Sequence, residues 1–183
     1  HVNPSLPLLE ELARRGVHYR GVLYAGLMFT PDGPKVLEFN CRFGDPETQA
    51  ILPRWEGDLV PALEACATGE LEEKMVRWKS DACVSVVLAA GGYPGSYLRG
   101  DLIEGLGDVE KEKDVVVFHA GTSLQEGRVV TAGGRVLNVT ALGADIRSAA
   151  ERAYAAAARI RFDGMYYRRD IAARALHRRR AVE

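Results

Sequence analysis

Polar and apolar positions alternate with a period of two through K-V-L-E-F-N-C-R-F, residues 35–43. Successive side chains of a β-strand point to opposite faces of the sheet, so this alternation predicts a strand over 35–42. The predicted strand has a mainly polar row and an apolar row, which are Val36, Glu38, Asn40 and Arg42, and Leu37, Phe39, Cys41 and Phe43. The apolar row, with Cys41 buried in it, is suited to packing. The polar row presents a carboxylate, an amide and a guanidinium in succession.

The segments around this strand predict a hairpin between helices. Leucines at helical spacing predict a helix over 4–15 that ends at Gly16. An apolar run over 21–29 and the turn residues of 30–34 make the strand at 35–42 the returning arm of an antiparallel pair. Asp45 and Pro46 are suited to the start of a helix that ends near Pro53. A further helix is expected from a cap at Asp58 to Gly69.

A charged stretch at about 70–80 lacks periodicity and predicts a boundary between a domain over 1–75 and another over 76–183. Five strand-like runs follow it, over 82–90, 101–104, 114–119, 128–131 and 134–141. Glycine-bearing turns separate them, as in a small antiparallel barrel or sandwich. Apolar residues at helical spacing from Ile146 to Ile160 predict one long packed helix, and a last helix runs from Asp170 to about 179.

Composition excludes several classes of protein. Lys and Arg total 24 against 25 Asp and Glu, so no net positive charge points to nucleic acid. Cys41, Cys66 and Cys83 are irregularly spaced and without a C-x-x-C pair, which argues against a disulfide framework or a zinc site. No apolar run is long enough to span a membrane. We therefore expect a cytoplasmic enzyme with no nucleic-acid or membrane partner.

The polar row on the 35–42 strand is the candidate site. Mg²⁺ takes oxygen ligands and is usually held by one or two carboxylates together with substrate phosphates. An arginine beside such a site offers a rigid fork of donors to phosphate or carboxylate oxygens. Glu38, Asn40 and Arg42 therefore suit a metal–phosphate site. The same alternation is also what a half-exposed strand with a solvated face shows.

Longer motifs favour the first alternative. The pattern E-x-N-x-R resembles the metal-binding strand of the ATP-grasp superfamily. The string E-F-N-C-R-F-G-D-P-E-T-Q, preceded by G-V-L-Y-A-G-L-M, resembles the phosphoribosylamine–glycine ligase family within it. The resemblance continues through V-V-L-A-A-G-G-Y-P-G, F-H-A-G-T, G-G-R-V-L-N-V-T-A-L-G and Y-Y-R-R-D-I. These motifs occur in the family's order and extend over essentially the whole chain.

The resemblance implies an α+β fold. The closing hairpin and helices of an ATP-grasp domain would come first, followed by the β-rich C-terminal domain. It also implies a longer enzyme, whose N-terminal portion precedes this chain and supplies most of the ATP-grasp fold. Such an enzyme joins glycine to 5-phosphoribosylamine with ATP, through a glycyl phosphate, in purine biosynthesis. Glu38 and Asn40 match the family's ligands for Mg²⁺ or Mn²⁺, and Asn40 and Arg42 would contact the nucleotide, with Arg42 catalytic.

Other positions are weaker candidates. Asp45 and Glu47 suit the glycine ammonium or the ordering of Arg42, although Asp45 equally suits a helix cap. The remaining candidate substrate contacts lie in two glycine-rich turns, which are Gly91, Gly92, Tyr93 and Pro94, and Gly133, Gly134 and Arg135. Backbone amides in such turns cradle phosphates, but hairpin geometry also requires glycine there. The run over 21–29 has no acidic residue, unlike the strand before the hairpin in many ATP-grasp enzymes, so the number of metal ions stays open.

Two other functions remain possible from the sequence. Without the upstream strands and lysines that hold ATP, the chain is alternatively an inert structural module that lines a substrate site. It is alternatively part of another ATP-grasp ligase of the carboxylate–amine or carboxylase type. The strings A-A-G-G-Y-P-G and Y-R-R-D-I argue against a carboxylase-type enzyme.

Overall fold

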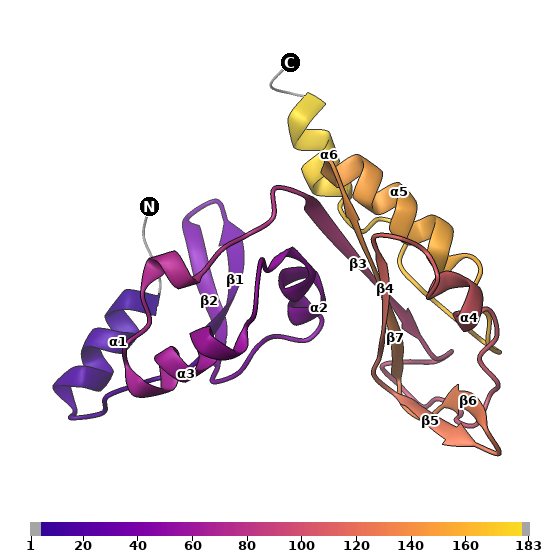
Figure 1. The fold of residues 1–183 in the computed structure, drawn as a ribbon, viewed down its shortest axis with the longest axis horizontal. Coiled ribbons are helices and arrows are strands. Elements are labelled where there is room, and N and C mark those ends of the chain that lie inside the picture. The colour runs from indigo at the N-terminus through magenta and orange to yellow at the C-terminus, as the bar shows by residue number, and fades with distance from the viewer. Residues whose placement is uncertain (1–4, 181–183) are drawn as a thin grey trace. The chain divides into compact units, whose positions relative to one another are not determined.

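The structure is a computed structural model that describes residues 5–180 (Figure 1). The chain divides into two compact units. Unit 1 comprises the described residues up to Thr48 together with Trp55–Trp78, and unit 2 comprises Gln49–Arg54 together with the described residues from Lys79 onward. Between residues 5 and 180, no helix is both long and apolar enough to cross a membrane.

Unit 1 is built from short helices and one hairpin. Its elements are α1 (Ser5–Arg14), β1 (Tyr24–Thr30), β2 (Gly33–Asn40), the start of α2 (Glu47–Ile51), α3 (Val60–Thr68) and the 3₁₀ turn η2 (Glu73–Met75). The predicted helices and hairpin are therefore confirmed, although Pro4 lies outside the described residues. Gly69 ends α3 in a left-handed conformation, with φ of 85°. The carboxylate of Asp58 accepts a 3.0 Å hydrogen bond from the backbone N–H of Val60 at the start of that helix.

A β-bulge interrupts the β1–β2 hairpin. Gly26 is opposite Glu38 and Leu27 is opposite Val36, so Leu37 is the extra residue on β2. Gly26 and Leu27 are neighbours on one strand and point to opposite faces, so their partners Glu38 and Val36 do as well. The prediction that Val36 shares the polar row is therefore wrong. A period-two pattern cannot reveal the inserted residue.

The apolar row of β2 is not packed within the described part of the chain. Leu37 is 65% exposed and Phe39 36%, and Cys41 is also exposed, which contradicts its predicted burial. The hairpin is a two-stranded sheet, and its row of exposed apolar side chains continues onto β1 at Phe29. Two strands alone have no second layer against which to bury a face.

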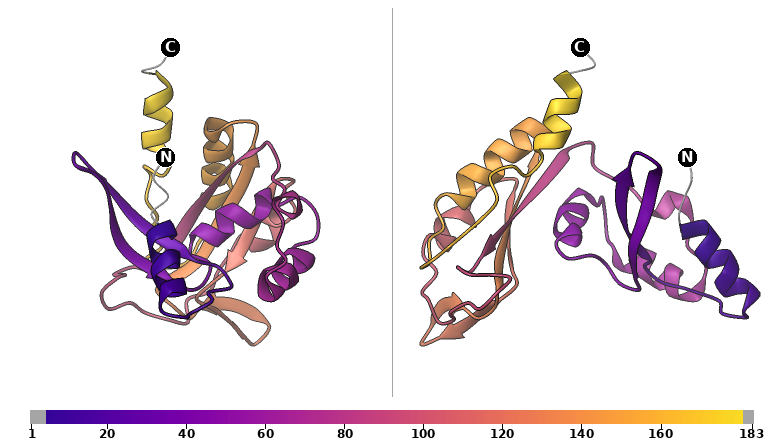
Figure 2. Two further views of the ribbon diagram at one scale, coloured as in Figure 1. Left: turned by 90° about the vertical axis from the view of Figure 1, so that its left-hand side faces the viewer. Right: turned by 180° about the vertical axis from the view of Figure 1, so that it is seen from behind.

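Unit 2 is a helix packed on an open sheet (Figure 2). Its elements are the 3₁₀ turn η1 (Leu52–Arg54), β3 (Ala82–Ala89), α4 (Leu106–Val109), β4 (Val115–His119), β5 (Thr122–Gln125), β6 (Arg128–Thr131), β7 (Arg135–Gly143), α5 (Ile146–Ala157) and α6 (Ala173–Arg180). The sheet has the antiparallel order β3-β7-β4, and β5 and β6 form a separate hairpin. The α+β class is confirmed. The sheets have three and two strands and are not closed into a barrel.

The long helix α5 lies where the sequence predicts it. Asp145 caps it, because its carboxylate accepts a 2.7 Å hydrogen bond from the Ser148 N–H, and the Asp145 N–H in turn donates a 3.1 Å hydrogen bond to the Ser148 hydroxyl oxygen. The core between helix and sheet consists of small and branched side chains, among them Val86, Leu88, Val139, Ala153 and Ala157. The alanine stripe lets the helix approach the sheet closely.

One predicted strand of unit 2 is wrong, and two elements of unit 2 were not predicted. The segment 101–104 is not a strand, because Leu102 and Glu104 each make one isolated bridge, to Val130 and Arg161. Gly100 and Gly105, both with positive φ, bound this segment. Its two bridges go to different parts of the chain, so no continuous ladder forms. The structure also adds β5 and α4. Both are four residues long.

Candidate functional site

The Glu38 face of the β1–β2 hairpin is defined by four residues. Asn40 is opposite Tyr24, and Glu38 is opposite Gly26. Because residues paired across strands share a face, and positions two apart on a strand do as well, Tyr24, Gly26, Glu38 and Asn40 all project to the same side. A Cβ at Gly26 would lie 3.1 Å from Cγ of Glu38 and 3.7 Å from the Tyr24 ring. Because Gly26 has no side chain, the Glu38 side chain can occupy the space beside it.

Glu47 joins this face from outside the hairpin. The Tyr24 hydroxyl donates a 3.1 Å hydrogen bond to Oε1 of Glu47, at the start of α2. Gly44 is buried and stands against the same carboxylate, where a Cβ would collide with Oε2. The hydrogen bond to Glu47, burial, and the negative charges of Glu47 and Glu38 raise the pKa of Tyr24. The Tyr24 hydroxyl is therefore the donor in its hydrogen bond to Glu47.

Arg42 lies beyond the end of β2. It is exposed, and its Nη1 donates a 2.9 Å hydrogen bond to the carbonyl oxygen of Phe43. The strand ends at Asn40, so alternation no longer fixes the direction of Arg42. Asp45 is exposed and precedes α2, where the Thr48 N–H and hydroxyl both donate to the Gly44 carbonyl. The roles predicted for Arg42 and Asp45 stay predictions.

The donor set suits a hard divalent cation that completes its coordination with substrate. Glu38 and Asn40 offer carboxylate and amide oxygens on one face, and Glu47 offers a second carboxylate nearby. Among the described residues, no group of three or more His, Cys, Asp or Glu side chains could hold a metal. The protein side chains of this face therefore do not form a complete set of metal ligands by themselves. Mg²⁺ bound by one or two carboxylates and by phosphates fits it.

The two glycine-rich turns of unit 2 lie against each other. The Ala90 N–H donates a 2.8 Å hydrogen bond to the Gly134 carbonyl. A Cβ on Gly134 would collide with the Tyr93 ring and come within 3.0 Å of the Tyr97 ring. Tyr93, which is 41% exposed, meets Tyr97 edge to face with ring centroids 6.2 Å apart. The structure thus brings together the candidates from both turns, although they are about 40 residues apart in sequence.

Close backbone packing accounts for several of these glycines. A Cβ on Gly91 would lie 2.8 Å from the Gly164 carbonyl oxygen, and one on Gly92, with φ of 91°, would collide with the Ser96 carbonyl. Gly133 packs on Gly121, whose N–H donates to the Arg135 carbonyl at 2.8 Å. These contacts support hairpin and packing geometry as the reason for glycine. The role of the turns in holding substrate stays a prediction.

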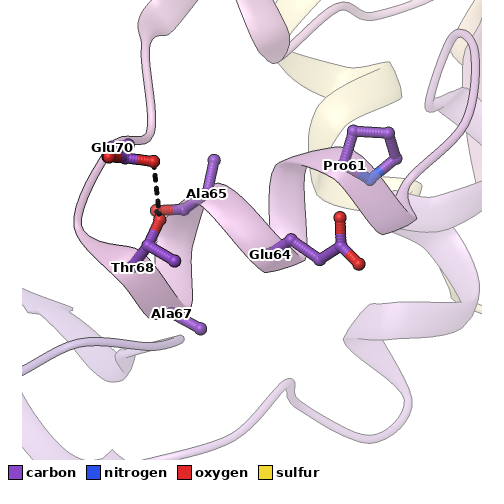
Figure 3. Close-up of a pocket in the computed structure, with 6 residues that line it drawn as sticks. All are labelled: Pro61, Glu64, Ala65, Ala67, Thr68 and Glu70. Carbon is purple, nitrogen blue, oxygen red and sulfur yellow. Dashed lines mark hydrogen bonds between the residues drawn. The ribbon is translucent and has the colours of Figure 1, made fainter.

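A surface hollow of ≈ 590 Å³ lies elsewhere in unit 1, along α3 (Figure 3). Its lining is Pro61, Glu64, Ala65, Ala67, Thr68 and Glu70. The Thr68 hydroxyl donates a 3.2 Å hydrogen bond to the Glu70 carboxylate within it. None of the predicted site residues lines this hollow. Its acidic side chains, Glu64 and Glu70, are exposed and come from α3 and the residues just after it. This hollow is not the candidate site.

Sequence reasoning missed Tyr24 as a member of the site. In the sequence it lies within the apolar run over 21–29, 14 residues before Glu38, and resembles an ordinary strand aromatic. Only the hairpin register, with Tyr24 opposite Asn40, brings it to the polar face.

Family comparisons bear on both units. Residues 83–174 match the family model for the phosphoribosylglycinamide synthetase C domain. Residues 5–48 match the model for the ATP-grasp (A) domain of the same synthetase. The chain belongs to the phosphoribosylglycinamide synthetase family. The predicted resemblance is thereby confirmed.

Individual relatives agree. A phosphoribosylamine–glycine ligase of Synechocystis sp. is 58% identical over 172 residues, which are 93% of this chain and 41% of that protein. The trifunctional purine biosynthetic protein adenosine-3 of Gallus gallus is 52% identical over 169 residues, 92% of this chain and 17% of that protein. The crystal structure of phosphoribosylamine–glycine ligase from Thermotoga maritima superposes with a TM-score of 0.75 at 35% identity, covering 94% of this chain and 44% of that one. The chain thus spans about two fifths of the bacterial ligases it matches.

Proposed function

We propose that this chain is the C-terminal part of a cytoplasmic phosphoribosylamine–glycine ligase. The complete enzyme would join glycine to 5-phosphoribosylamine and convert ATP to ADP and phosphate. The Glu38 face is the observation that supports this function most directly, because it sets Glu38 and Asn40 side by side on one strand within the stretch that matches the ATP-grasp model. The domain division follows the same proposal, with an ATP-grasp piece over 1–75 and the C-terminal domain over 76–183.

The proposed chemistry proceeds through a glycyl phosphate. A carboxylate oxygen of glycine attacks the γ-phosphorus of ATP, and the bond to the ADP oxygen breaks. The amine of phosphoribosylamine then attacks the acyl carbon, and phosphate leaves as the amide forms. Catalysis of such steps depends mainly on positioning and on stabilising developing charge.

Each side chain of the site has a defined task in this scheme. Glu38 and Asn40 would hold Mg²⁺ or Mn²⁺, and a bound cation of this kind neutralises phosphate oxygens. Arg42 would offer its guanidinium fork to the phosphoryl or acyl-phosphate oxygens. Asp45 and Glu47 follow Arg42 closely in the sequence, and their carboxylates would bind the glycine ammonium. In unit 2, the glycine turns with Tyr93, Pro94 and Arg135 would contact substrate.

Reconstitution tests the proposal. The 183-residue chain is mixed with the portion that precedes the matched segment in the Synechocystis relative, and ADP release is measured with ATP, glycine and phosphoribosylamine. We expect no turnover by either part alone, because the chain contains only the closing hairpin of an ATP-binding fold. Turnover should appear in the mixture and require both substrates. Glu38→Gln should abolish it, whereas Glu10→Gln, an exposed change on α1, should not.

The alternatives make different predictions in the same assay. An inert structural module would give a mixture whose activity is unaffected by Glu38→Gln. Another ATP-grasp carboxylate–amine ligase would turn over with a different acid or amine in place of glycine or phosphoribosylamine. A mutation-sensitive ATPase activity of the isolated chain would contradict the proposal, because it requires a complete nucleotide site in these 183 residues.

A further inference from the structure

Tyr24 is a member of the Glu38 face to which the proposed chemistry gives no task. Its partner across the hairpin is Asn40, so both side chains leave the sheet on the same side. Its ring lies beside Gly26, next to the Cγ atom of Glu38. Tyr24 therefore adjoins both proposed metal ligands.

The hydroxyl of Tyr24 reaches past the hairpin to Glu47. Its hydrogen bond to Oε1 is 3.1 Å long and joins residues 23 positions apart in the sequence. A glutamate has three rotatable side-chain bonds, and a hydrogen bond to its carboxylate selects among the rotamers. A Cβ at Gly44 would collide with the other carboxylate oxygen, Oε2, so glycine at this position leaves the space that the carboxylate occupies. The Tyr24 hydroxyl therefore orients the Glu47 carboxylate within the space that Gly44 leaves.

We propose that Tyr24 is a positioning residue, which holds the Glu47 carboxylate beside Glu38 and Asn40 as a second carboxylate for the divalent cation. This inference rests on the proposed function, because it assigns Glu47 to the cation and not to the glycine ammonium. Mg²⁺ and Mn²⁺ favour one or two carboxylates with substrate phosphates, and Glu38 with Glu47 supplies two. Partners that orient a metal ligand by hydrogen bonding commonly change metal affinity 10- to 100-fold when they are removed.

Paramagnetic line broadening by Mn²⁺ tests the inference on the 183-residue chain without an activity assay. Side-chain and backbone signals of Glu38, Asn40 and Glu47 are followed by NMR as Mn²⁺ is added. In the unchanged chain, all three sets of signals should broaden together at the same Mn²⁺ concentrations. Signals of Glu10 on α1 serve as the reference for non-specific binding at exposed carboxylates.

Two substitutions separate the hydrogen bond from the charge. Tyr24→Phe removes only the hydroxyl, and it should weaken Mn²⁺ binding about tenfold while Glu47 loses its broadening relative to Glu38. Glu47→Gln keeps an acceptor for the Tyr24 hydroxyl but removes the negative charge, and it should weaken binding to a similar degree. Tyr166→Phe is the matched control, because Tyr166 is 61% exposed and lies in unit 2. An amide spectrum that overlays on that of the unchanged chain shows that each variant folds.

The outcomes separate this inference from the proposed function. Broadening at Glu38 and Asn40 with Glu47 unaffected, or equal affinity in the unchanged chain and in Tyr24→Phe, would overturn the role of Tyr24 and leave the Glu38–Asn40 site standing. The absence of selective broadening at Glu38 and Asn40 would overturn this inference, because Tyr24 would then have no cation site to support. The ligase function would still be decided by the reconstitution assay, in which substrate phosphates are present. A Tyr24→Phe chain with a collapsed amide spectrum would contradict a positioning role, because the tyrosine would then serve the fold.

Discussion

Gly26 and Glu38 face each other across the hairpin, and the glutamate uses the space that the glycine leaves. The 3.1 Å separation between Cγ of Glu38 and a Cβ built on Gly26 is tighter than ordinary van der Waals contact. An added methyl group at residue 26 would therefore force the Glu38 side chain to shift away from Gly26. The backbone of one strand thus determines where a proposed metal ligand on the other strand can lie.

Gly26→Ala is accordingly expected to weaken Mn²⁺ binding severalfold with little change in the free energy of unfolding. Glycine inside a strand costs roughly 0.5–1 kcal/mol relative to alanine, and this gain offsets the strain of moving a flexible glutamate. NMR titration with Mn²⁺ and urea unfolding measure the two effects separately. Gly107→Ala is the control, because a Cβ there meets nothing within 4 Å. Unchanged Mn²⁺ affinity in Gly26→Ala would show that the Glu38 position is not restricted by residue 26.

Arg42→Lys tests the catalytic role of the guanidinium in the reconstituted enzyme. Lysine keeps the charge and loses the fork of donors, which matters most when phosphate charge redistributes in the transition state. We expect kcat to fall more than KM for ATP rises, as steady-state kinetics would show. Arg15→Lys, at an exposed residue beyond the end of α1, is a suitable control. A raised KM with unchanged kcat would instead make Arg42 a residue that binds ATP in the ground state.

Gly121→Ala tests the packing of the glycine turns. A Cβ at this position would lie 2.6 Å from both the Arg135 carbonyl oxygen and Cα of Gly133, which are backbone atoms that cannot rotate away. Overpacking of this kind costs about 1–3 kcal/mol, and urea unfolding should report that loss. The same measurement on Gly107→Ala should show almost none. An unchanged free energy of unfolding in Gly121→Ala would show that Gly121 and the turn at Gly133 can move apart without loss of stability. Close packing would then not be the reason for glycine at these positions.

Cys83 should make the free energy of unfolding of unit 2 fall as the pH becomes alkaline. Burial raises the pKa of its thiol to about 11, from 9.0 for the ordinary group, against the smaller opposite effects of Arg54 and Lys79. The unfolded chain therefore loses this proton first. The contribution of Cys83 is complete below pH 9 and is lost as the pH rises toward 11. Cys83→Ala should flatten the decline of unfolding free energy across that window.

Cys41→Ala is the matched control for this pH series, because the Cys41 thiol is exposed. Its stability profile should parallel that of the unchanged chain. Alkylation at pH 8 offers a second comparison, in which Cys41 should react much faster than Cys83. Equal alkylation rates for the two thiols would contradict the burial of Cys83.

Local sequence by itself determined most of the elements of this chain. The α1–β1–β2 order follows from helical spacing, turn residues and a period-two run, each of which depends on neighbours within a few positions. Asp145 and Ser148 cap α5 because both partners lie within one helical turn. The motif around Glu38 and Asn40 likewise indicates the family without reference to the fold, since a continuous stretch of residues is enough to match a pattern.

Tertiary structure decided which residues of that motif share a face. The bulge at Leu37 separates Val36 from Glu38, and a period-two pattern has no means of showing an inserted residue. Tyr24 reaches Glu47 only because the hairpin register and the start of α2 bring them together. The exposure of Leu37 depends on what covers a sheet face, which alternation along one strand does not specify. Pairing between segments distant in the sequence therefore determines the geometry of the site, whereas the local sequence determines which residues and elements form it.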